Sequence, residues 1–212
     1  MGIPKTVRNK RIILGVTGAS GAVFARRTLQ MLEADPRVEK IHLVISASGL
    51  RLLRDELDLD ISKQAQIPRL LAAQSTRKTE CLRDSDIGAS IASGSYAVEG
   101  MVVIPCTTGC LGQIAGGISD TLIERAADVC LKQGHKLILA VRDAPFNRIH
   151  LENMLRAQLA GAVIFPIIPT FYHRPKTLDD LVTQFCCRVL ALLDLEQMEQ
   201  YRWEGDGKRG RD

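Results

Sequence analysis

Five short apolar runs, rich in Val and Ile and without polar–apolar alternation, constrain the fold more than any other feature of the sequence. They cover residues 12–16, 41–46, 100–105, 136–142 and 162–168. Strands that are apolar on both faces are typical of a parallel sheet covered by helices on both sides. Helical patterns follow the runs at residues 22–34, 48–56, 120–133, 151–160 and 177–193. The sequence therefore predicts an α/β fold, a flavodoxin-like or Rossmann-like three-layer sandwich with a central parallel sheet.

The domain organisation follows from the unbroken alternation of these elements. The chain has 212 residues, of which 46% are hydrophobic, and this is enough to build one core. We find no linker, low-complexity tract or internal repeat, and we expect a single domain over residues 11–195. Residues 1–10 are predicted to be a disordered basic tail. Residues 196–212 are predicted to be a C-terminal extension that serves as a lid or an interface segment, with Trp203 as its candidate lid residue.

Charge and cysteine content exclude some classes of protein. The net charge is only +4 and aromatic residues make up 4% of the chain, which argues against a nucleic-acid-binding protein. The six cysteines show no zinc-type spacing with histidines and are expected to be reduced core thiols. Without a signal peptide or an apolar run of membrane-spanning length, the sequence predicts a cytoplasmic protein with no membrane span.

A glycine-serine turn links the first predicted strand to the first predicted helix. Gly15, Gly18 and Gly21 are evenly spaced and do not form the dinucleotide fingerprint. Backbone N–H groups left unpaired at a helix start, together with the hydroxyl of Ser20, suit a nucleotide or flavin phosphate. The alternative is a plain strand-to-helix turn that binds no ligand.

Hydroxyl-bearing and cationic residues follow the other predicted strands. Because ligands of doubly wound folds gather at the carboxyl ends of the strands, we expect these residues to form one site. They are residues 17–20, Ser46, residues 106–110, Arg142 with Asp143, and residues 172–174. The alternative is that Ser46 and Thr107 are helix caps and Arg142 is a surface ion-pair partner.

Three further cations lie within predicted helices. Arg125 and Lys132 are seven residues apart, on roughly the same helix face. Arg188 interrupts an apolar face, where a buried guanidinium would require a partner anion. That anion is either a ligand or, in a purely structural role, an acidic side chain on another element.

The order of six motifs resembles that of the UbiX-type flavin prenyltransferases, the UbiX/Pad family of homo-oligomeric flavoproteins. The resemblance extends from about Arg11 to Trp203. The motifs are Val16-Thr-Gly-Ala-Ser-Gly-Ala22, Ile104-Pro-Cys-Thr-Thr-Gly109, Leu122-Ile-Glu-Arg-Ala-Ala-Asp-Val129 with Leu131-Lys132, Val141-Arg-Asp-Ala-Pro145, His150-Leu-Glu-Asn-Met-Leu155 and Phe171-Tyr-His-Arg-Pro175.

This resemblance implies a metal-independent prenyltransferase. It would attach a dimethylallyl group from dimethylallyl monophosphate to N5 and C6 of reduced FMN, the acceptor substrate. The product, prenylated FMN, would serve as cofactor of a UbiD-type decarboxylase in ubiquinone biosynthesis or aromatic-acid breakdown. The resemblance also implies a homo-oligomer, commonly a dodecamer.

The family's functional residues carry over onto positions of this chain. Ser20 and Glu56 resemble the acid-base pair, and Tyr172 and Arg188 resemble ligands of the prenyl phosphate. Lys132, Asp143 and Arg125, the last from a neighbouring subunit, resemble the rest of the phosphate cage, to which Arg142 also belongs. The flavin contacts would be Gly18, Ala19, Ser20, Ser46, Thr107, Thr108, Gly109, Cys110 and Arg142.

The sequence departs from the family pattern at two positions and leaves two alternatives open. Asp143 replaces a usual glutamate, and Cys110 replaces a common threonine. A non-catalytic FMN-binding subunit of a decarboxylase is one alternative. The other is a flavin-dependent cysteine decarboxylase, which uses a histidine after the second strand and an asparagine after the third. This chain has no histidine between His42 and His135, and Gly109 occupies the asparagine position.

Overall fold

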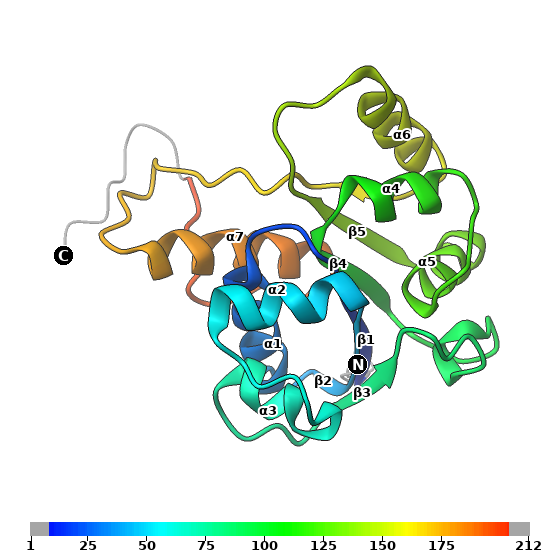
Figure 1. The fold of residues 1–212 in the computed structure, drawn as a ribbon. Helices are drawn as coiled ribbons and strands as arrows, with labels where there is room; N and C mark the ends of the chain where they lie inside the picture. The colour runs from blue at the N-terminus through cyan, green and yellow to red at the C-terminus, as the bar shows by residue number, and fades with distance from the viewer. Residues whose placement is uncertain (1–8, 204–212) are drawn as a thin grey trace, which may run out of the picture.

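The computed structural model describes residues 9–203 and contains a six-stranded sheet between two layers of helices (Figure 1). The strands are β1 (Lys10–Val16), β2 (Val38–Ile45), β3 (Thr79–Arg83), β4 (Gly100–Cys106), β5 (Lys136–Val141) and β6 (Val163–Ile164). The helices are α1 (Ala22–Ala34), α2 (Ala47–Leu57), α3 (Ile67–Ala72), α4 (Thr108–Ala115), α5 (Leu122–Gln133), α6 (Arg148–Leu159) and α7 (Leu178–Leu192). Short 3-10 helices form at η1 (Gln64–Gln66) and η2 (Ser90–Ala92).

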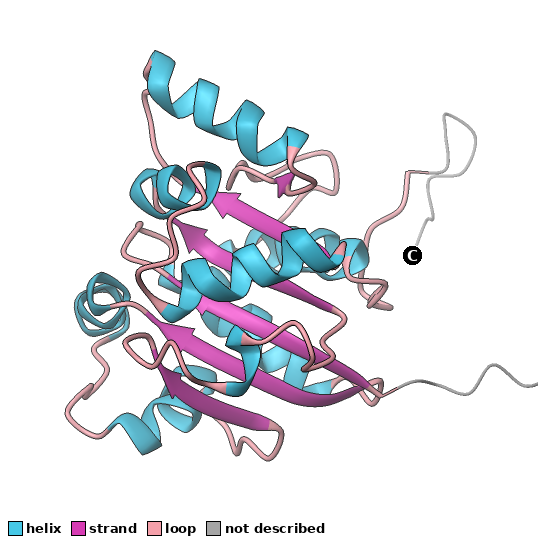
Figure 2. Cartoon of the chain, turned by 90° about the vertical axis from the view of Figure 1, so that its right-hand side faces the viewer, coloured by secondary structure: helices cyan, strands magenta, loops and turns pink. Residues whose placement is uncertain are grey.

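The strand order is β3-β2-β1-β4-β5-β6, and every neighbouring pair is parallel. From β1 the chain builds outward first through β2 and β3 and then, on the other side, through β4, β5 and β6. The direction of winding therefore reverses between β1 and β4, and ligands of such sheets bind beyond the carboxyl ends of the strands at this point. The predicted fold class is confirmed, and Figure 2 shows the strands side by side with helices on both sides.

Two apolar cores hold the layers together because alternate strand residues point to opposite faces. Ile12, Leu14 and Val16 of β1 pack in the core that α1, α2, α3 and α7 cover. Ile13 of β1 and Met101 of β4 pack in the other core, which contains buried residues of α4, α5 and α6. Both faces of the central strands are thus removed from water, as the apolar runs predicted.

Several elements differ from the expectation. All five predicted runs contain a strand, but β3 was missed because Thr79-Glu-Cys-Leu-Arg83 is a polar edge strand. The helices α3 and α4 were missed as well, the first short and the second carrying two glycines. The strand predicted at residues 162–168 is reduced to β6. Phe165 and Ile167 still donate N–H bonds to Leu139 and Val141, but Pro166 between them has no N–H.

The two ends of the chain are described in part. The strand β1 already begins at Lys10, and residues 1–8 and 204–212, with most of the predicted tail and half of the predicted extension, lie outside the described range. Residues 194–203, here called the C-terminal strap, follow α7 and fold back beside it (Figure 1). Trp203 at its end is 65% exposed, and its role as a lid stays a prediction. None of the described helices is long and apolar enough to cross a membrane.

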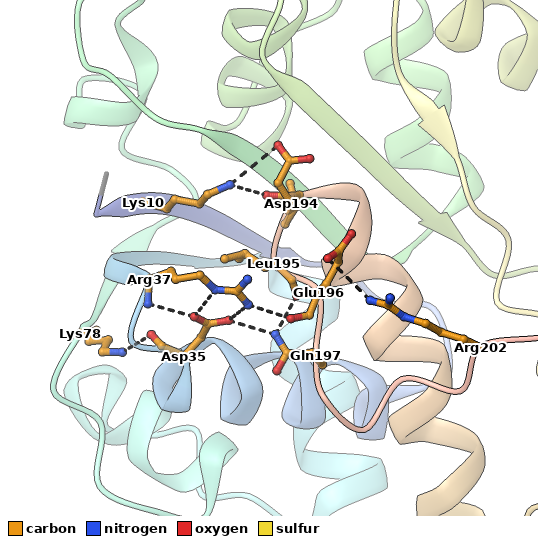
Figure 3. A network of polar contacts seen from close by, with 10 residues as sticks. Lys10, Asp35, Arg37, Lys78, Asp194, Leu195, Glu196, Gln197 and Arg202 are labelled. Atoms are coloured by element: carbon orange, nitrogen blue, oxygen red, sulfur yellow. Dashed lines mark hydrogen bonds and ion pairs between the residues drawn. The ribbon is translucent and has the colours of Figure 1, made fainter. Parts of the chain in front are cut away.

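A buried carboxylate anchors the start of the strap. Asp35, which follows α1, accepts bonds from the guanidinium of Arg37 at 2.6 and 2.9 Å and from Gln197 Nε2 at 3.0 Å (Figure 3). The same Arg37 donates to the carbonyl oxygen of Glu196 at 2.9 Å. Burial raises the pKa of Asp35, but the bonds from Arg37 and Gln197 outweigh it and lower the pKa from 3.8 to about 2.

We expect Asp35→Asn to reduce the free energy of unfolding by roughly 1 to 2 kcal/mol at neutral pH. Because the folded-state pKa is depressed, this contribution is complete above pH 3.8 and is lost as the pH falls through about 2. Chemical denaturation of wild type and variant at pH 7 and near pH 2 checks the prediction. A stability difference of the same size at both pH values would contradict it.

Candidate functional site

Thr17 joins the ends of β1 and β4 at the point where the winding of the sheet reverses. Its backbone N–H and its hydroxyl both donate to the carbonyl oxygen of Pro105, at 3.1 and 2.9 Å. The hydroxyl oxygen also accepts the N–H of Thr107 at 2.8 Å. Thr17 is buried, so the glycine-serine turn and the segment after β4 are held in a fixed relation. The sequence predicted that Thr17 lies at the carboxyl ends of the strands, but it did not predict the hydrogen bonds of Thr17 with Pro105 and Thr107.

The glycine-serine turn is closed by a carboxylate from α2. Glu56 accepts the N–H of Gly21 at 3.0 Å and that of Ala22 at 2.8 Å. The expectation that these N–H groups are left unpaired for a phosphate is therefore wrong, because an acidic side chain already occupies the positive end of α1. Gly18 is also required for packing within the chain: a Cβ there would lie 2.4 Å from the Cβ of Ser48, so the absence of a side chain lets α2 approach the turn.

Two other predicted site residues, Ser20 and Arg142, interact with this carboxylate. Burial raises the pKa of Glu56, but hydrogen bonds from Ser20, Ala22 and Gly21 and the charge of Arg142 outweigh it and leave the pKa below its usual value. Glu56 is thus held ionised beside the Ser20 hydroxyl. No carboxylate of the described chain forms an ion pair with the exposed Arg142, which does not support its alternative as a surface ion-pair partner.

Loss of the Glu56 charge should loosen this turn. The amide of Glu56→Gln has one acceptor oxygen in place of two and no charge, so we expect about 1 kcal/mol less stability. The matched control is Asp55→Asn, since Asp55 is exposed on the same helix and pairs only with the adjacent Arg54 among the described residues. The midpoint of thermal unfolding checks the prediction, and equal midpoints for the two variants would refute it.

The N-cap residues of α2 and α4 also lie at this edge. Ser46 Oγ accepts the N–H of Gly49 at 3.0 Å, and Thr107 Oγ1 accepts the N–H of Cys110 at 3.1 Å. The helix-cap interpretation is confirmed for both residues. Each is only partly buried. The Thr107 hydroxyl still has a proton that it can donate to a ligand, and the Ser46 hydroxyl also lies 3.0 Å from that of Ser48, where either oxygen can be the donor.

The residues that depart from the family pattern have defined partners. Asp143 accepts bonds from the Thr108 hydroxyl at 3.2 Å and from the N–H of Ala144 at 2.9 Å. The thiol of Cys110 is buried, and its bond with Cys106 and its burial raise its pKa well above the usual value. This thiol therefore lies in the core, away from the exposed edge where Asp143 lies.

Arg188 on α7 lies close to the same edge. Its Cζ atom is 5.2 Å from the centre of the Phe165 ring, a cation–π contact that the sequence did not indicate. Phe165 pairs with Leu139 of β5, three residues before Arg142. The guanidinium is exposed, so the expected burial is not found in the single chain. It has no acidic partner among residues 9–203, which speaks against a structural ion pair within the chain.

Tyr172 lies in the irregular loop between β6 and α7. Its ring is 52% exposed and lies 5.4 Å from that of Tyr201, a residue of the C-terminal strap, and 6.0 Å from that of His173. Its hydroxyl has no hydrogen bond within the described chain. Tyr172 is thus available to a ligand.

Arg125 and Lys132 do not join the other cations within one chain. Arg125 donates to the carbonyl oxygen of Ala92 in η2 and pairs with Asp128 at 2.9 Å. Lys132 lies in the last turn of α5, just before β5 begins, whereas Arg142 comes after β5 ends. A strand of that length spans about 20 Å. Lys132 therefore lies at the edge formed by the amino ends of the strands, opposite the edge at their carboxyl ends where Arg142 lies. Between residues 9 and 203, no group of three or more His, Cys, Asp or Glu side chains could hold a metal ion.

Comparison with known proteins places this geometry in context. Residues 3–186 match the model of the Flavoprotein family. The flavin prenyltransferase LpdB of Lactiplantibacillus plantarum is 40% identical over 197 residues, which cover 93% of this chain and 100% of LpdB.

Two solved structures resemble the chain along almost its whole length. The crystal structure of AnUbiX (PadA1) in complex with FMN and dimethylallyl pyrophosphate is 38% identical, with a TM-score of 0.83, and the match covers 93% of this chain and 99% of AnUbiX. A dodecameric FMN-dependent Ubix-like decarboxylase from Escherichia coli O157:H7 is 38% identical, with a TM-score of 0.80 and coverage of 92% and 100%.

Proposed function

The chain is a member of the Flavoprotein family and, within it, of the flavin prenyltransferases, and from this premise we propose that it transfers a dimethylallyl group from dimethylallyl monophosphate to reduced FMN. The observation that carries the proposal is a pair of guanidinium groups, Arg142 and Arg188, near one edge of the sheet without an acidic ion-pair partner in the described chain. An allylic phosphate ionises readily only where the departing dianion is stabilised. Two planar forks suit phosphate oxygens.

The residues at the edge fit an FMN molecule. The Ser46, Thr107 and Thr108 hydroxyls line it, and Gly109 is exposed, where a Cβ would contact only Thr107 Oγ1 at 3.8 Å, so that a flat ring can approach α4. Arg142 would balance the charge of the flavin. We assign the remaining predicted contacts, Gly18, Ala19, Ser20 and the backbone of Cys110, to the same ligand on the resemblance to the family.

Different side chains of the protein would serve different steps of the reaction. The C–O bond of the donor breaks, and the phosphate leaves with the electron pair toward Arg142, Arg188 and the hydroxyl of Tyr172. When bound, reduced FMN supplies the two atoms, N5 and C6, that form the new bonds to carbon. The ionised Glu56, hydrogen-bonded to Ser20, would carry the proton that ring closure moves. Asp143, held by Thr108, would orient the phosphate cage.

A second copy of the chain would complete the cage. Because Lys132 lies at the opposite edge of its own sheet, we assign Lys132 and Arg125 to the site of a neighbouring subunit. This requires a homo-oligomer, and we propose a dodecamer, the assembly of the E. coli relative. We further propose a cytoplasmic location and a UbiD-type decarboxylase as recipient of prenylated FMN.

The mass of the flavin tests the proposed activity. The protein is incubated anaerobically with reduced FMN and dimethylallyl monophosphate, and the extracted flavin is weighed, with omission of the donor as control. We expect a product heavier than FMN by one dimethylallyl-derived unit. An unchanged mass from folded, FMN-loaded protein would defeat the proposal and favour the non-catalytic FMN-binding subunit.

A further inference from the structure

The C-terminal strap crosses α7 beside Arg188. The side-chain amide of Gln184 donates to the carbonyl oxygen of Glu199 at 2.7 Å and accepts the N–H of Tyr201 at 2.8 Å. Gln184 precedes Arg188 by one helical turn, so the two side chains lie on the same face of α7. The strap is therefore fastened to the helix face that presents the Arg188 guanidinium.

The start of the strap is fastened independently. Gln197 donates to the buried Asp35, and the carbonyl oxygen of Glu196 accepts from Arg37 (Figure 3). Residues 196–201 are thus fixed at two points, one on the turn after α1 and one on α7. Tyr201 is held at its backbone, because its own N–H donates to the side chain of Gln184.

Tyr201 is the strap's contact with the loop that carries Tyr172. Its ring lies 5.4 Å from that of Tyr172 and 6.3 Å from that of His173, which in turn lies 6.0 Å from Tyr172. The three rings form one cluster. Of its members, only Tyr201 comes from outside the loop.

The loop between β6 and α7 borders a hollow in the structure. A hollow of about 580 Å³ separates residues 173–176 from Arg27 and Thr183, and Glu199 and Tyr201 line another side of it. Both ring nitrogens of His173 are buried without a hydrogen-bond partner in the described chain. The N–H of Arg174 donates to the carbonyl oxygen of Phe171 at 2.9 Å and closes a turn around Tyr172. The Tyr172 ring itself is positioned by its contacts with the rings of His173 and Tyr201, and of these two residues only Tyr201 is anchored outside the loop.

We infer that Tyr201 is a positioning residue: through ring contacts it holds Tyr172 beside Arg188, where both would bind the phosphate of the prenyl donor. The inference rests on the proposed function. It makes donor binding, and not flavin binding, depend on the strap, because the flavin contacts assigned above come from β1, β2, β4 and β5 and the helices that follow them. Loss of the Tyr201 ring should free Tyr172 while leaving Arg188 on its helix.

Steady-state kinetics of single variants test this role. For Tyr201→Ala we expect the KM for dimethylallyl monophosphate to rise about tenfold, kcat to fall less, and the Kd for FMN to change less than about twofold. Tyr201→Phe keeps the ring and should restore the wild-type KM. Met198→Ala is the matched control, since Met198 lies on the same strap with its side chain fully exposed.

A second variant tests the same role if Tyr201→Ala does not fold. Gln184→Ala removes the fastening of the strap but keeps all three rings, and it should raise the same KM by a smaller factor. A folded, FMN-binding Tyr201→Ala protein with the wild-type KM and kcat would overturn the inference and leave the proposed function intact. If the wild-type protein leaves FMN unmodified, the proposed function fails and the inference falls with it.

Discussion

Arg188→Ala is expected to reduce the rate of FMN prenylation by roughly a hundred- to a thousandfold while sparing FMN binding, because this side chain would stabilise charge that appears only as the phosphate departs. Arg188 belongs to α7, whereas the hydroxyls of Ser46, Thr107 and Thr108 that we assign to the flavin lie at the starts of α2 and α4. Arg188→Lys keeps the charge but loses the planar fork, and we expect an intermediate rate. Single-turnover kinetics and FMN titration of the three proteins check the prediction.

A matched control separates this effect from general loss of surface charge. Arg69→Ala removes an exposed arginine from α3, and its rate should equal that of wild type. If Arg188→Ala loses FMN along with activity, the assignment of Arg188 to the donor phosphate is wrong. A full rate in Arg188→Ala would contradict it equally.

Mixed oligomers provide the second large effect. We expect Lys132→Ala and Arg188→Ala each to be nearly inactive alone. If Lys132 serves the site of a neighbouring copy, subunits of the two variants that are denatured together and refolded should regain activity. Random assembly of equal amounts leaves about a quarter of the sites with both wild-type side chains, so about a quarter of the wild-type rate should return.

The reassociation experiment has its own control. The two variants mixed without denaturation should remain inactive if the oligomer exchanges subunits slowly. A refolded mixture that contains mixed oligomers but shows no gain in rate would place Lys132 and Arg188 on the same subunit of each site, or outside the site.

The layers of the fold could be predicted because a strand that is buried on both faces appears in the sequence as an uninterrupted apolar run. Runs such as residues 12–16 and 100–105 are apolar throughout, and their neighbours in the sheet follow from the alternation with helices. Edge strand β3 contains no such run, since Thr79 and Glu80 lie where one side of the strand meets solvent. The glycines of α4 similarly hide a helix whose N-cap and packing stabilise it.

The candidate site was predictable as a set of strand-end residues but not as a set of contacts. The strand-end positions alone placed Ser20 and Arg142 in one site, whereas Glu56 joined them only through the family resemblance. The sequence did not show that Glu56 pairs with N–H groups 34 and 35 residues away, because no local pattern encodes such a bond. Similarly, the spacing of Arg125 and Lys132 indicated one helix face but not the edge of the sheet at which Lys132 lies.

A crystal structure of the assembled protein with FMN and dimethylallyl monophosphate tests the central claim most directly. We predict that Arg142 and Arg188 of one chain and Lys132 and Arg125 of a neighbouring chain lie within hydrogen-bond or ion-pair distance of the donor phosphate, with the five-carbon group against the flavin ring. Those side chains directed into solvent, with no space for a dimethylallyl group beside the flavin, would contradict it.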